Sequence, residues 1–582
     1  MTCVRKRNGP YWRAAESKAM ARRILGPGFR FNETKRQEQR HVKFDVDALL
    51  QAIAASVKRP VEDITSLVKL HEGDHNRILQ ATFNDKLQVL AKIPYHTVAK
   101  HYEIASEAAT LTLLRHYKFT QVPEVLGYSA DANNPVKTEY LLMSKVPGRR
   151  LSEVWPDLDD EAKEKVAIQI VRLEADIMGL KFPASGSLYF KNDLPEGTET
   201  YNRKRATDTR DPIVVGPSAQ RDWWTGFRAQ LHVHRGPWLK FRKAATAPAI
   251  REMVVCKKHA IPLKTRQRWL RELYQFQQFE PKHYVELLKQ YMRLSSVISV
   301  ASTHFLARRT LRHPNLSPEN ILVDPQTPGE ITGLIDWQGA EILPLGLCAG
   351  LPPHSQQCKD PNPHQLNNPE STLPETWDFL NNSLQESKRH GGEQYISPQQ
   401  YMTLSRDMNR SHFRALKNSG AMIRPRLYRH ASKPWDGGLL DLQYALVHAS
   451  SNWRSLQSSR LFGLLDRGNR PVAARLNREI MHSFLKYPCP LQYSEEEFER
   501  IQAFREAEAK RNLLADRKKR AMGVGRGGWV RDFQHLRQAR TLAWRINRGL
   551  KLDGSEDEDF KRRNPADKGS EEPESPSEDP QQ

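Results

Sequence analysis

The segment RHPNLSPENILVD, residues 312–324, decides the fold of this chain. Its polar half, up to Asn320, has the composition of a loop, and the apolar Ile-Leu-Val that follows is typical of a short buried strand. A helix is expected before the loop. A turn is expected at Pro328-Gly329, and a second apolar strand then ends at Asp336. An amide oxygen and a carboxylate on neighbouring loops are a pair that can hold Mg²⁺ on a triphosphate.

A cation for the phosphates lies earlier in the chain. Lys92 ends the apolar run 87–92, and Glu107 lies on the next expected helix, residues 100–117, where it is placed to pair with Lys92. Taken alone, a lysine in a strand is more often a surface charge, and an acid after a strand is often only a helix cap. In this order and at this spacing, the lysine, the glutamate, the asparagine and the aspartate together predict a site for nucleotide phosphates.

The residues around Lys92 predict a small, twisted antiparallel sheet with one helix against it. An amphipathic helix is expected over residues 45–57, ahead of the sheet. The turn Asn84-Asp85-Lys86 between two apolar runs is typical of a hairpin. The expected strands are residues 63–70, 77–83, 87–93, 121–128 and 140–146.

After Arg150 the pattern becomes helical, with two weaker interruptions. Residues 185–235 are expected to form an extended insertion, and the proline-rich residues 350–393 a loop. A capping box of Ser494 and Glu497 begins a long helix that ends in a basic run before a glycine cluster. Two apolar stripes at helical spacing are expected to face a core: Val166, Ile170, Leu173 and Ile177, and Leu287, Tyr291, Leu294 and Ile298.

Composition excludes several classes of protein. The chain has 582 residues and a formal charge of +22, and its 38% of hydrophobic residues indicates polar tails or insertions beside a packed core. No uncharged apolar run approaches the roughly 20 residues that cross a bilayer. Five cysteines without a C-x-x-C pair argue against a disulfide scaffold and fit a reducing compartment.

Charge is concentrated at the two ends. Residues 1–40 carry eleven basic and three acidic side chains, and residues 553–582 carry eleven acidic and four basic ones. The acidic end is expected to be a disordered tail. For the basic start two interpretations stay open, a mitochondrial transit peptide and an ordinary basic leader.

The motifs resemble those of the protein kinase-like superfamily. His313 to Asn320 is similar to the catalytic loop H-x-D-x-x-x-x-N with one change, and Asp336-Trp337-Gln338 stands where that superfamily has its metal-binding D-F-G. Because I-D-W replaces D-F-G and no A-P-E segment follows, the aminoglycoside or choline phosphotransferase branch is the closer match. Further short sequence motifs, among them Ala91–Pro94 and Leu142–Gly148, resemble those of the fungal family of altered inheritance of mitochondria protein 9. This resemblance covers roughly residues 29–345.

This resemblance implies an α+β, two-lobed protein kinase-like fold with a small antiparallel sheet in the N-lobe, a mainly helical C-lobe and a helical C-terminal extension. It also implies ATP and Mg²⁺ as cofactors, a small-molecule hydroxyl as acceptor, and a mitochondrial location, with a cytoplasmic one otherwise. The expected division is a basic leader (1–43), an N-lobe (44–149), a C-lobe (150–493), a helical extension (494–550) and a disordered acidic tail (551–582).

The resemblance also assigns roles in nucleotide binding. Gly73 would form the turn over the phosphates, although the full G-x-G-x-x-G is missing. Lys92 would contact the α- and β-phosphates, oriented by Glu107. The backbone of the linker at Met143 and Lys145 would meet adenine. The metal ligands would be Asn320 and Asp336.

Asn315 is the departure from the family pattern, which has an aspartate there to orient the attacking hydroxyl and accept its proton. A carboxamide cannot act as that base, and general-base assistance contributes about 10²–10⁴-fold in rate. Positioning and charge neutralisation dominate phosphoryl transfer, so nucleotide binding is better supported than catalysis. Two functions stay open: an ATP-dependent phosphotransferase, and a pseudokinase that acts as an interaction scaffold.

Other patterns favour structural interpretations. Nucleic-acid binding is disfavoured because no recognised module is present. The aromatic residues at 223, 224 and 227 are expected in the core of the helical lobe rather than in an acceptor pocket. The spacing of four metal-ligating residue types is not that of a common zinc site: Cys348, His354, Cys358 and His364.

Overall fold

The computed structural model describes residues 41–73, 75–95, 99–202, 212–352, 396–417, 420, 423–461 and 488–521. The sheets and the site belong to one compact unit, residues 39–507, whereas residues 508–521 belong to a second unit. The basic start, the acidic tail, the glycine cluster after the long helix and most of the proline-rich loop lie outside the described residues. Among the described helices, none is both long enough and apolar enough to cross a membrane.

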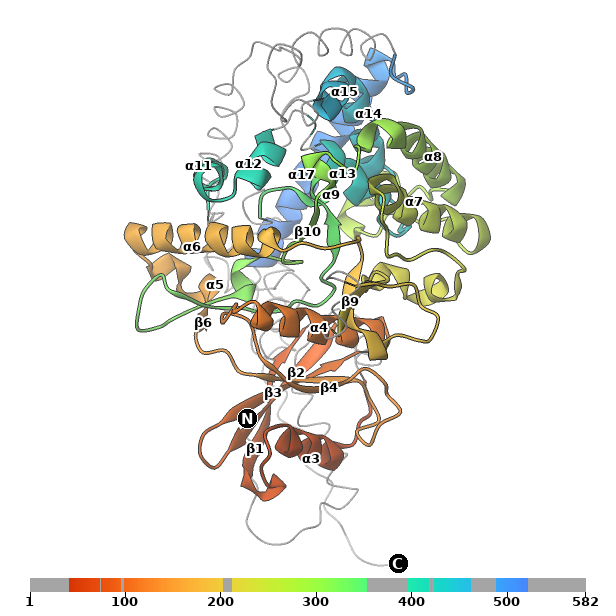
Figure 1. The fold of residues 1–582 in the computed structure, drawn as a ribbon. Helices are drawn as coiled ribbons and strands as arrows, with labels where there is room; N and C mark the ends of the chain where they lie inside the picture. Colours follow the sequence, from red (N-terminus) through yellow and green to blue (C-terminus); the bar gives the residue numbers. More distant parts are fainter. Residues whose placement is uncertain are drawn as a thin grey trace, which may run out of the picture. The chain divides into compact units, whose positions relative to one another are not determined.

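Five antiparallel strands form the N-terminal sheet, in the order β1-β2-β3-β5-β4 (Figure 1). Alternate residues of β2 are buried, as expected where one face of a strand is covered. The predicted hairpin joins β2 to β3, and Lys86 has a φ of 71° at its tip. All five predicted strands are therefore confirmed. Their bounds are β1 (Ile64–Glu72), β2 (Asn76–Phe83), β3 (Gln88–Pro94), β4 (Val125–Ser129) and β5 (Tyr140–Ser144).

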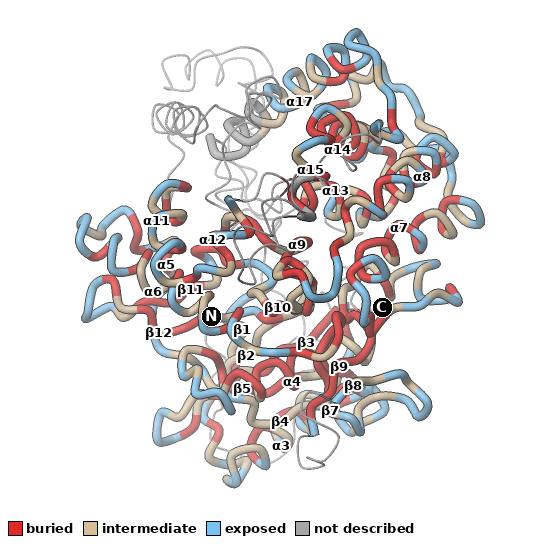
Figure 2. The backbone as a smooth tube through the Cα atoms, turned by 45° about the horizontal axis from the view of Figure 1, so that its top comes forward, coloured by how far each residue is buried: buried red, intermediate tan, exposed pale blue. Residues whose placement is uncertain are grey.

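Two helices accompany this sheet, as predicted. Helix α3 (Val46–Ser56) begins after Asp45, whose carboxylate accepts the Ala48 N–H at 3.0 Å. Helix α4 (Tyr102–His116) packs on β4 and on a strand of the C-terminal half, β7 (Ser187–Phe190). Because both sides are covered, α4 buries charged as well as apolar side chains. Figure 2 shows buried residues along α4, β3 and β5.

The C-terminal half is mainly helical. Both predicted apolar stripes face a core, with Leu173 and Leu287 at their half-buried margins. The capping box is confirmed: Ser494 Oγ accepts the Glu497 N–H at 3.1 Å, and Glu497 accepts the Ser494 N–H at 3.0 Å. The helices are α5 (Leu151–Val154), α6 (Asp160–Gly179), α7 (Phe241–Lys258), α8 (Pro281–Ile298), α9 (Leu345–Cys348), α11 (Pro398–Met408), α12 (Arg410–Lys417), α13 (Ile423–Ala431), α14 (Leu440–Ser451), α15 (Trp453–Leu461) and α17 (Glu495–Ala521).

Three small sheets accompany the N-terminal sheet and these helices. The insertion 185–235 is more ordered than its composition indicates, because β7, β9 and β8 pair in it. The helix expected to lead into the loop at 312–320 is wrong: a three-residue strand, β10, enters it and is held by pairing with β13. The other small sheet has the order β12-β11-β6. The bounds are β6 (Arg149–Arg150), β8 (Tyr201–Asn202), β9 (Ile213–Gly216), β10 (Arg309–Leu311), β11 (Ile321–Val323), β12 (Ile331–Leu334) and β13 (Ile342–Pro344).

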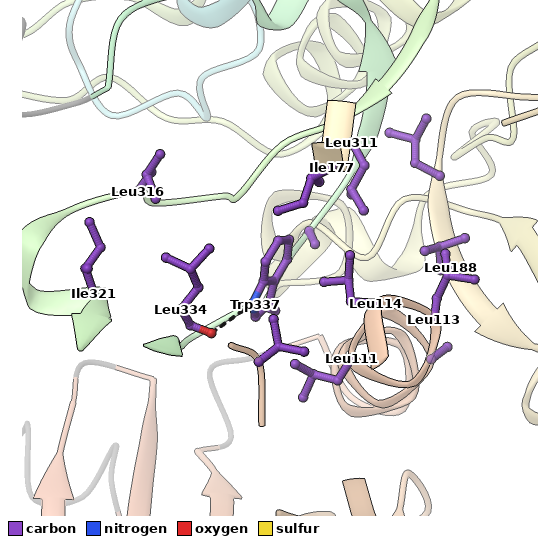
Figure 3. Packing of buried hydrophobic residues seen from close by; sticks show 14 of the residues in the cluster. Leu111, Leu113, Leu114, Ile177, Leu188, Leu311, Leu316, Ile321, Leu334 and Trp337 are labelled. Atoms are coloured by element: carbon purple, nitrogen blue, oxygen red, sulfur yellow. Dashed lines mark hydrogen bonds between the residues drawn. The ribbon is translucent and has the colours of Figure 1, made fainter. Parts of the chain in front are cut away.

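Trp337 fills the core where the two halves of the unit meet. Its side chain is fully buried, and its indole Nε1 donates to the Leu334 carbonyl at 3.2 Å (Figure 3). Apolar side chains from α4, from α6 and from the loop before β11 lie around it in the same cluster (Figure 3). The residue after Asp336 therefore anchors this segment in the core shared by both halves.

Trp337→Ala should destabilise the protein by about 3–5 kcal/mol, because the large cavity cannot be refilled by neighbours on several elements. Urea denaturation followed by far-ultraviolet circular dichroism measures this loss. The matched control is Phe227→Ala, which removes an aromatic ring that is 54% exposed and should cost less than about 1 kcal/mol. Equal losses in the two variants would contradict the role of Trp337.

Candidate functional site

Lys92 and Glu107 form a buried ion pair. Lys92 lies on β3, the middle strand of the sheet, and Glu107 lies on the face of α4 that covers it. The Lys92 Nζ lies 2.9 and 2.7 Å from the two Glu107 carboxylate oxygens, and the two side chains are only 4% and 3% exposed. The pair predicted from the spacing of the two residues is present.

Burial disfavours charge on both partners, and their neighbours decide the outcome. At Lys92 the carboxylates of Glu107 and Asp336 outweigh burial and raise the pKa of the ammonium group. Burial raises the pKa of the Glu107 carboxyl, and the Asp336 carboxylate adds to this against the opposing effect of Lys92. Because the contact is bidentate and each charge has its partner, we treat the pair as ionised.

Asp336 connects this pair to the second half of the site. Its Oδ1 lies 3.3 Å from Lys92 Nζ, and its side chain is 46% exposed. Its φ of 68° is in the left-handed region, where a residue other than glycine is strained. The preceding residue fixes this backbone, because the Ile335 N–H donates to the Asn320 carbonyl at 2.9 Å.

His313 braces the same backbone from the loop. Its Nε2 lies 3.0 Å from the Ile335 carbonyl, and its Nδ1 lies 3.2 Å from the Asn315 N–H. Burial lowers the pKa of His313 to about 4, so the ring is neutral near pH 7. The two partners then assign the proton to Nε2 and the lone pair to Nδ1. The ring also meets the edge of Trp337, with centroids 4.6 Å apart.

Asn315 and Asn320 lie on one turn of this loop. The Asn315 carbonyl accepts from Asn320 Nδ2 at 3.0 Å and from the Ser317 N–H at 2.8 Å. The Asn315 side chain is exposed and makes no hydrogen bond within the described part of the chain. The backbone of Asn315 is therefore fixed at both ends, whereas its carboxamide faces solvent.

The residues present fit a magnesium ion. Asn320 Nδ2 donates to the Asn315 carbonyl, so Asn320 Oδ1 is left to bind a metal ion. The exposed Asp336 carboxylate supplies a second oxygen ligand. Oxygen donors are those that Mg²⁺ prefers, and it is usually held by few protein ligands and by phosphate oxygens. Among the described residues, no group of three or more histidine, cysteine, aspartate or glutamate side chains could hold a metal ion. Of the four residues weighed as zinc ligands, only Cys348 is described.

The three residues expected near the rest of the nucleotide lie on the N-terminal sheet. Gly73 joins β1 to β2, and its N–H donates to the Asn76 carbonyl at 2.9 Å. Met143 is buried on β5 opposite Leu90 of β3. Lys145 directly follows β5, and its Nζ donates to Gln80 at 3.0 Å.

Gln338 belongs to the predicted motif, but its own role in the site was not predicted from the sequence. Its Oε1 accepts from Asn76 Nδ2 at 2.6 Å, and its Nε2 donates to the Glu103 carboxylate. It therefore joins the turn after Gly73 and the start of α4 to the segment that carries Asp336. Arg221 makes a similar link from the insertion, with Nη1 2.9 Å from the His75 ring. Separations of 262 and 146 residues left no pattern that could have shown either link.

The insertion holds the first turn of α4. Tyr128 donates to Asp193 Oδ2 at 2.7 Å, and His101 contacts the Asp193 carbonyl. Trp224 stacks on Tyr102, with ring centroids 3.7 Å apart. The helix that carries Glu107 is thus fixed from both halves of the unit.

The expectation that the three aromatic residues of the insertion belong to the core is confirmed only in part. Trp223 is buried in the core of the helical half, and Trp224 is half-buried beside it. Phe227 contradicts the expectation, because it is 54% exposed and stacks on His259 with ring centroids 4.6 Å apart. At the surface, the His259 ring covers one face of the Phe227 ring instead of a buried core.

Comparison with known proteins finds similarity over the part of the chain that contains these site residues. The model of the phosphotransferase enzyme family matches residues 67–346. A subtelomeric hrmA-associated cluster protein of Aspergillus fumigatus is 31% identical over 425 residues, which are 68% of this chain and 80% of that protein. Altered inheritance of mitochondria protein 9 of Lachancea thermotolerans is 26% identical over 308 residues. That match covers 48% of this chain and 49% of the relative, so the chain spans about half the length of this mitochondrial relative.

Solved structures of similar fold include phosphotransferases. The GDP complex of wild-type aminoglycoside 2'-phosphotransferase-IIIa is 13% identical, with a TM-score of 0.30, covering 75% of this chain and 97% of that chain. An ethanolamine kinase of Plasmodium vivax is 9% identical, with a TM-score of 0.30, covering 72% and 81% of the two chains.

Glu103 should make stability depend on pH. Burial raises the pKa of its carboxyl from 4.5 to about 7, against the lowering effects of Gln338 and Lys92. A carboxyl group with a raised pKa stabilises the folded protein while it is protonated. This contribution to the free energy of unfolding is present in full below pH 4.5 and is lost as the pH rises through about 7. Between pH 5 and pH 8 the Tm of the unmodified protein should therefore fall relative to that of Glu103→Gln, by on the order of 5 °C.

Differential scanning fluorimetry of the two proteins across this range measures the change. Buried carboxyls that do not interact with Glu103 titrate in both proteins and cancel in the difference, whereas Glu139, whose pKa the Glu103 carboxylate helps to raise, adds to it. Glu164→Gln, at an exposed position on α6, is the reference for a solvent-facing carboxylate. A difference between the unmodified protein and Glu103→Gln that stays constant with pH would show that burial does not control the Glu103 carboxyl.

Proposed function

Because the chain belongs to the phosphotransferase enzyme family, we propose that it binds Mg-ATP between its two halves and transfers the γ-phosphate to an oxygen of a small-molecule acceptor. In this proposal the nucleotide lies between an N-lobe of residues 44–149 and a C-lobe of residues 150–493. The family resemblance implies a hydroxyl as the acceptor.

The observation that carries the proposal is the buried Lys92–Glu107 pair reaching Asp336. Removing two charges from water is costly, and a site that needs a fixed cation is a physical reason to keep them. Lys92 would contact the α- and β-phosphates, and Glu107 would hold its ammonium group in place. The adenine ring would meet the backbone at Met143 and Lys145.

The other residues of the site would position the reacting phosphate. Asn320 and Asp336 would hold Mg²⁺, which neutralises charge on the β- and γ-phosphates when it is bound. His313 and the Asn320 carbonyl brace the backbone of Ile335 and so fix the direction of the Asp336 carboxylate. Gly73 would bring the turn between β1 and β2 over the phosphates. This arrangement supplies the positioning and charge neutralisation on which phosphoryl transfer mainly depends.

A mitochondrial location is part of the proposal. It is supported by relatives named as mitochondrial proteins and by the eleven basic side chains among the first 40 residues. The cytoplasm is the alternative.

Asn315 favours a second candidate function. Its exposed carboxamide cannot accept a proton from a hydroxyl, so the chain would be a pseudokinase that acts as an interaction scaffold, with weak or no catalysis. The phosphotransferase requires a nucleotide site from which phosphate is transferred, whereas the scaffold requires no phosphate transfer.

Mg-ATP should bind with micromolar affinity, and Asp336→Ala should abolish the Mg²⁺-dependent part of that binding, because it removes the only carboxylate of the proposed metal site. Isothermal titration calorimetry with and without Mg²⁺ measures both. The matched control is Asp407→Ala on α11, which removes an exposed aspartate paired with its neighbour Arg406 and should bind like the unmodified protein. No binding up to millimolar ATP would refute the phosphotransferase proposal and leave a kinase-shaped scaffold.

Asn315→Asp should restore the base and raise transfer to alcohols, or hydrolysis of ATP, by about 10²–10⁴-fold. ADP release in a coupled assay measures the gain, at matched Mg-ATP occupancy determined by calorimetry. An unchanged rate at full occupancy would mean that the acceptor site or the metal geometry is also missing, which favours the scaffold.

A further inference from the structure

Asn315 also bears on the chemistry of the acceptor, and this inference rests on the proposed function. A hydroxyl carries a proton that must leave as its oxygen attacks phosphorus, so an alcohol acceptor needs a base within hydrogen-bonding reach. The position that supplies this base in the family pattern holds a carboxamide, which has N–H donors and no basic group.

Neighbouring groups on the loop do not replace the base. Both ring nitrogens of His313 are engaged, one with the Ile335 carbonyl and one with the Asn315 N–H. Arg312 is a permanent cation that donates to the buried Glu174 carboxylate. Glu174 is in turn enclosed by that guanidinium and by the Tyr401 hydroxyl.

Asp336 is committed as well. One of its oxygens contacts Lys92, and the carboxylate is the proposed ligand of Mg²⁺. Glu319 is the remaining carboxylate of the segment 312–320, and it is exposed on the turn that contains Asn320. A direct test of Glu319 therefore belongs in the experiment.

We propose that the acceptor is an anionic oxygen, a carboxylate or a phosphate, that needs no base because it carries no proton at neutral pH. Carboxyl groups ionise near pH 4 and the second proton of a phosphate monoester leaves near pH 6. The exposed Asn315 carboxamide can donate a hydrogen bond to such an oxygen and orient it. An aspartate at the same place would repel it. The net charge of +22 also favours the approach of anions over that of neutral alcohols.

The reaction balances without proton transfer. A lone pair of the acceptor oxygen forms the new bond to the γ-phosphorus, while the bond from that phosphorus to the oxygen it shares with the β-phosphate breaks. The electron pair of the broken bond leaves with ADP, and Lys92 is the cation proposed to contact the α- and β-phosphates. A carboxylate gives an acyl phosphate and a phosphate gives a phosphoanhydride, with no change in oxidation state.

Small nucleophiles test the proposal, because they can reach the reacting phosphate without needing a complementary pocket. The full chain with saturating Mg-ATP is given acetate, inorganic phosphate, ethanol or glycerol at matched ionic strength, and ADP release is measured. Acetyl phosphate is trapped by hydroxylamine as the hydroxamate, and pyrophosphate is measured enzymatically, so that the two anion classes are told apart. We expect at least one anion to raise ADP release about tenfold over water, with one phosphorylated anion formed per ADP, and we expect no effect of the alcohols.

Substitutions at residue 315 give the matched comparison. Asn315→Asp should lower anion phosphorylation about tenfold by like-charge repulsion while it gains activity on alcohols. Asn315→Ala removes the donors without adding charge, and it should lower anion phosphorylation without creating alcohol activity. Glu319→Gln should leave anion phosphorylation unchanged and should create no activity on alcohols.

Each other outcome overturns the inference in a distinct way. If acetate raises ADP release but only inorganic phosphate appears, acetate has replaced a missing base for water, and the natural acceptor is a hydroxyl. Acceleration by alcohols alone would show that a base is present and would contradict the inference. If Glu319→Gln abolished that acceleration, Glu319 would be the base. No acceleration by any nucleophile, with nucleotide bound, would establish the scaffold. Failure of nucleotide binding itself appears in the calorimetry and refutes the proposed function instead.

Discussion

The buried contact between Lys92 and Glu107 is the constraint on which the rest of the site depends. Two charges that are almost completely removed from water remain favourable only while each stays within hydrogen-bonding distance of the other. Strand β3 and helix α4 must therefore keep a fixed separation and rotation. The first turn of α4 is held accordingly from the insertion, through Asp193 and Trp224, and from the segment after β12, through Gln338. The same contacts explain why α4 is buried on more than one side.

Asp336 connects this pair to the C-terminal half. The neighbouring residue anchors the segment in the core, and the Asp336 carboxylate itself faces the site. Its neighbour Trp337 is completely buried, whereas its own carboxylate is 46% exposed and its φ of 68° turns the chain between the two. His313 and Asn320 hold the Ile335 peptide that precedes the turn. The strained backbone at Asp336 is thus stabilised by packing on one side and by two hydrogen bonds on the other, as strained residues at functional sites generally require.

The parts of this site that were predictable from the sequence are those fixed by local order. Lys92 near the end of a strand and Glu107 on the following helix are 15 residues apart in the chain, so their pairing follows from one strand and the helix that comes next. The contacts of Gln338 were not predictable, because they join segments as far as 262 residues apart and use an ordinary polar side chain. The helix expected before the loop was wrong because β10 has only three residues, too few for periodicity, and exists through its pairing with β13. Pairing between distant segments also ordered the insertion, whose strands are two to four residues long.

The loop also shows why the base of the family pattern could be lost without loss of the fold. Every hydrogen bond that residue 315 makes in the described part of the chain uses its backbone: its N–H donates to His313 and its carbonyl accepts from Asn320 and from Ser317. Its side chain is exposed and has no role in packing. Aspartate and asparagine therefore satisfy the same local geometry, and folding does not select between them. What differs is the charge and the basicity presented to the ligand. Which residue is suitable at position 315 therefore depends on the ligand of the proposed site. For this reason the carboxamide is informative about the acceptor, even though it contributes nothing to the stability of the loop.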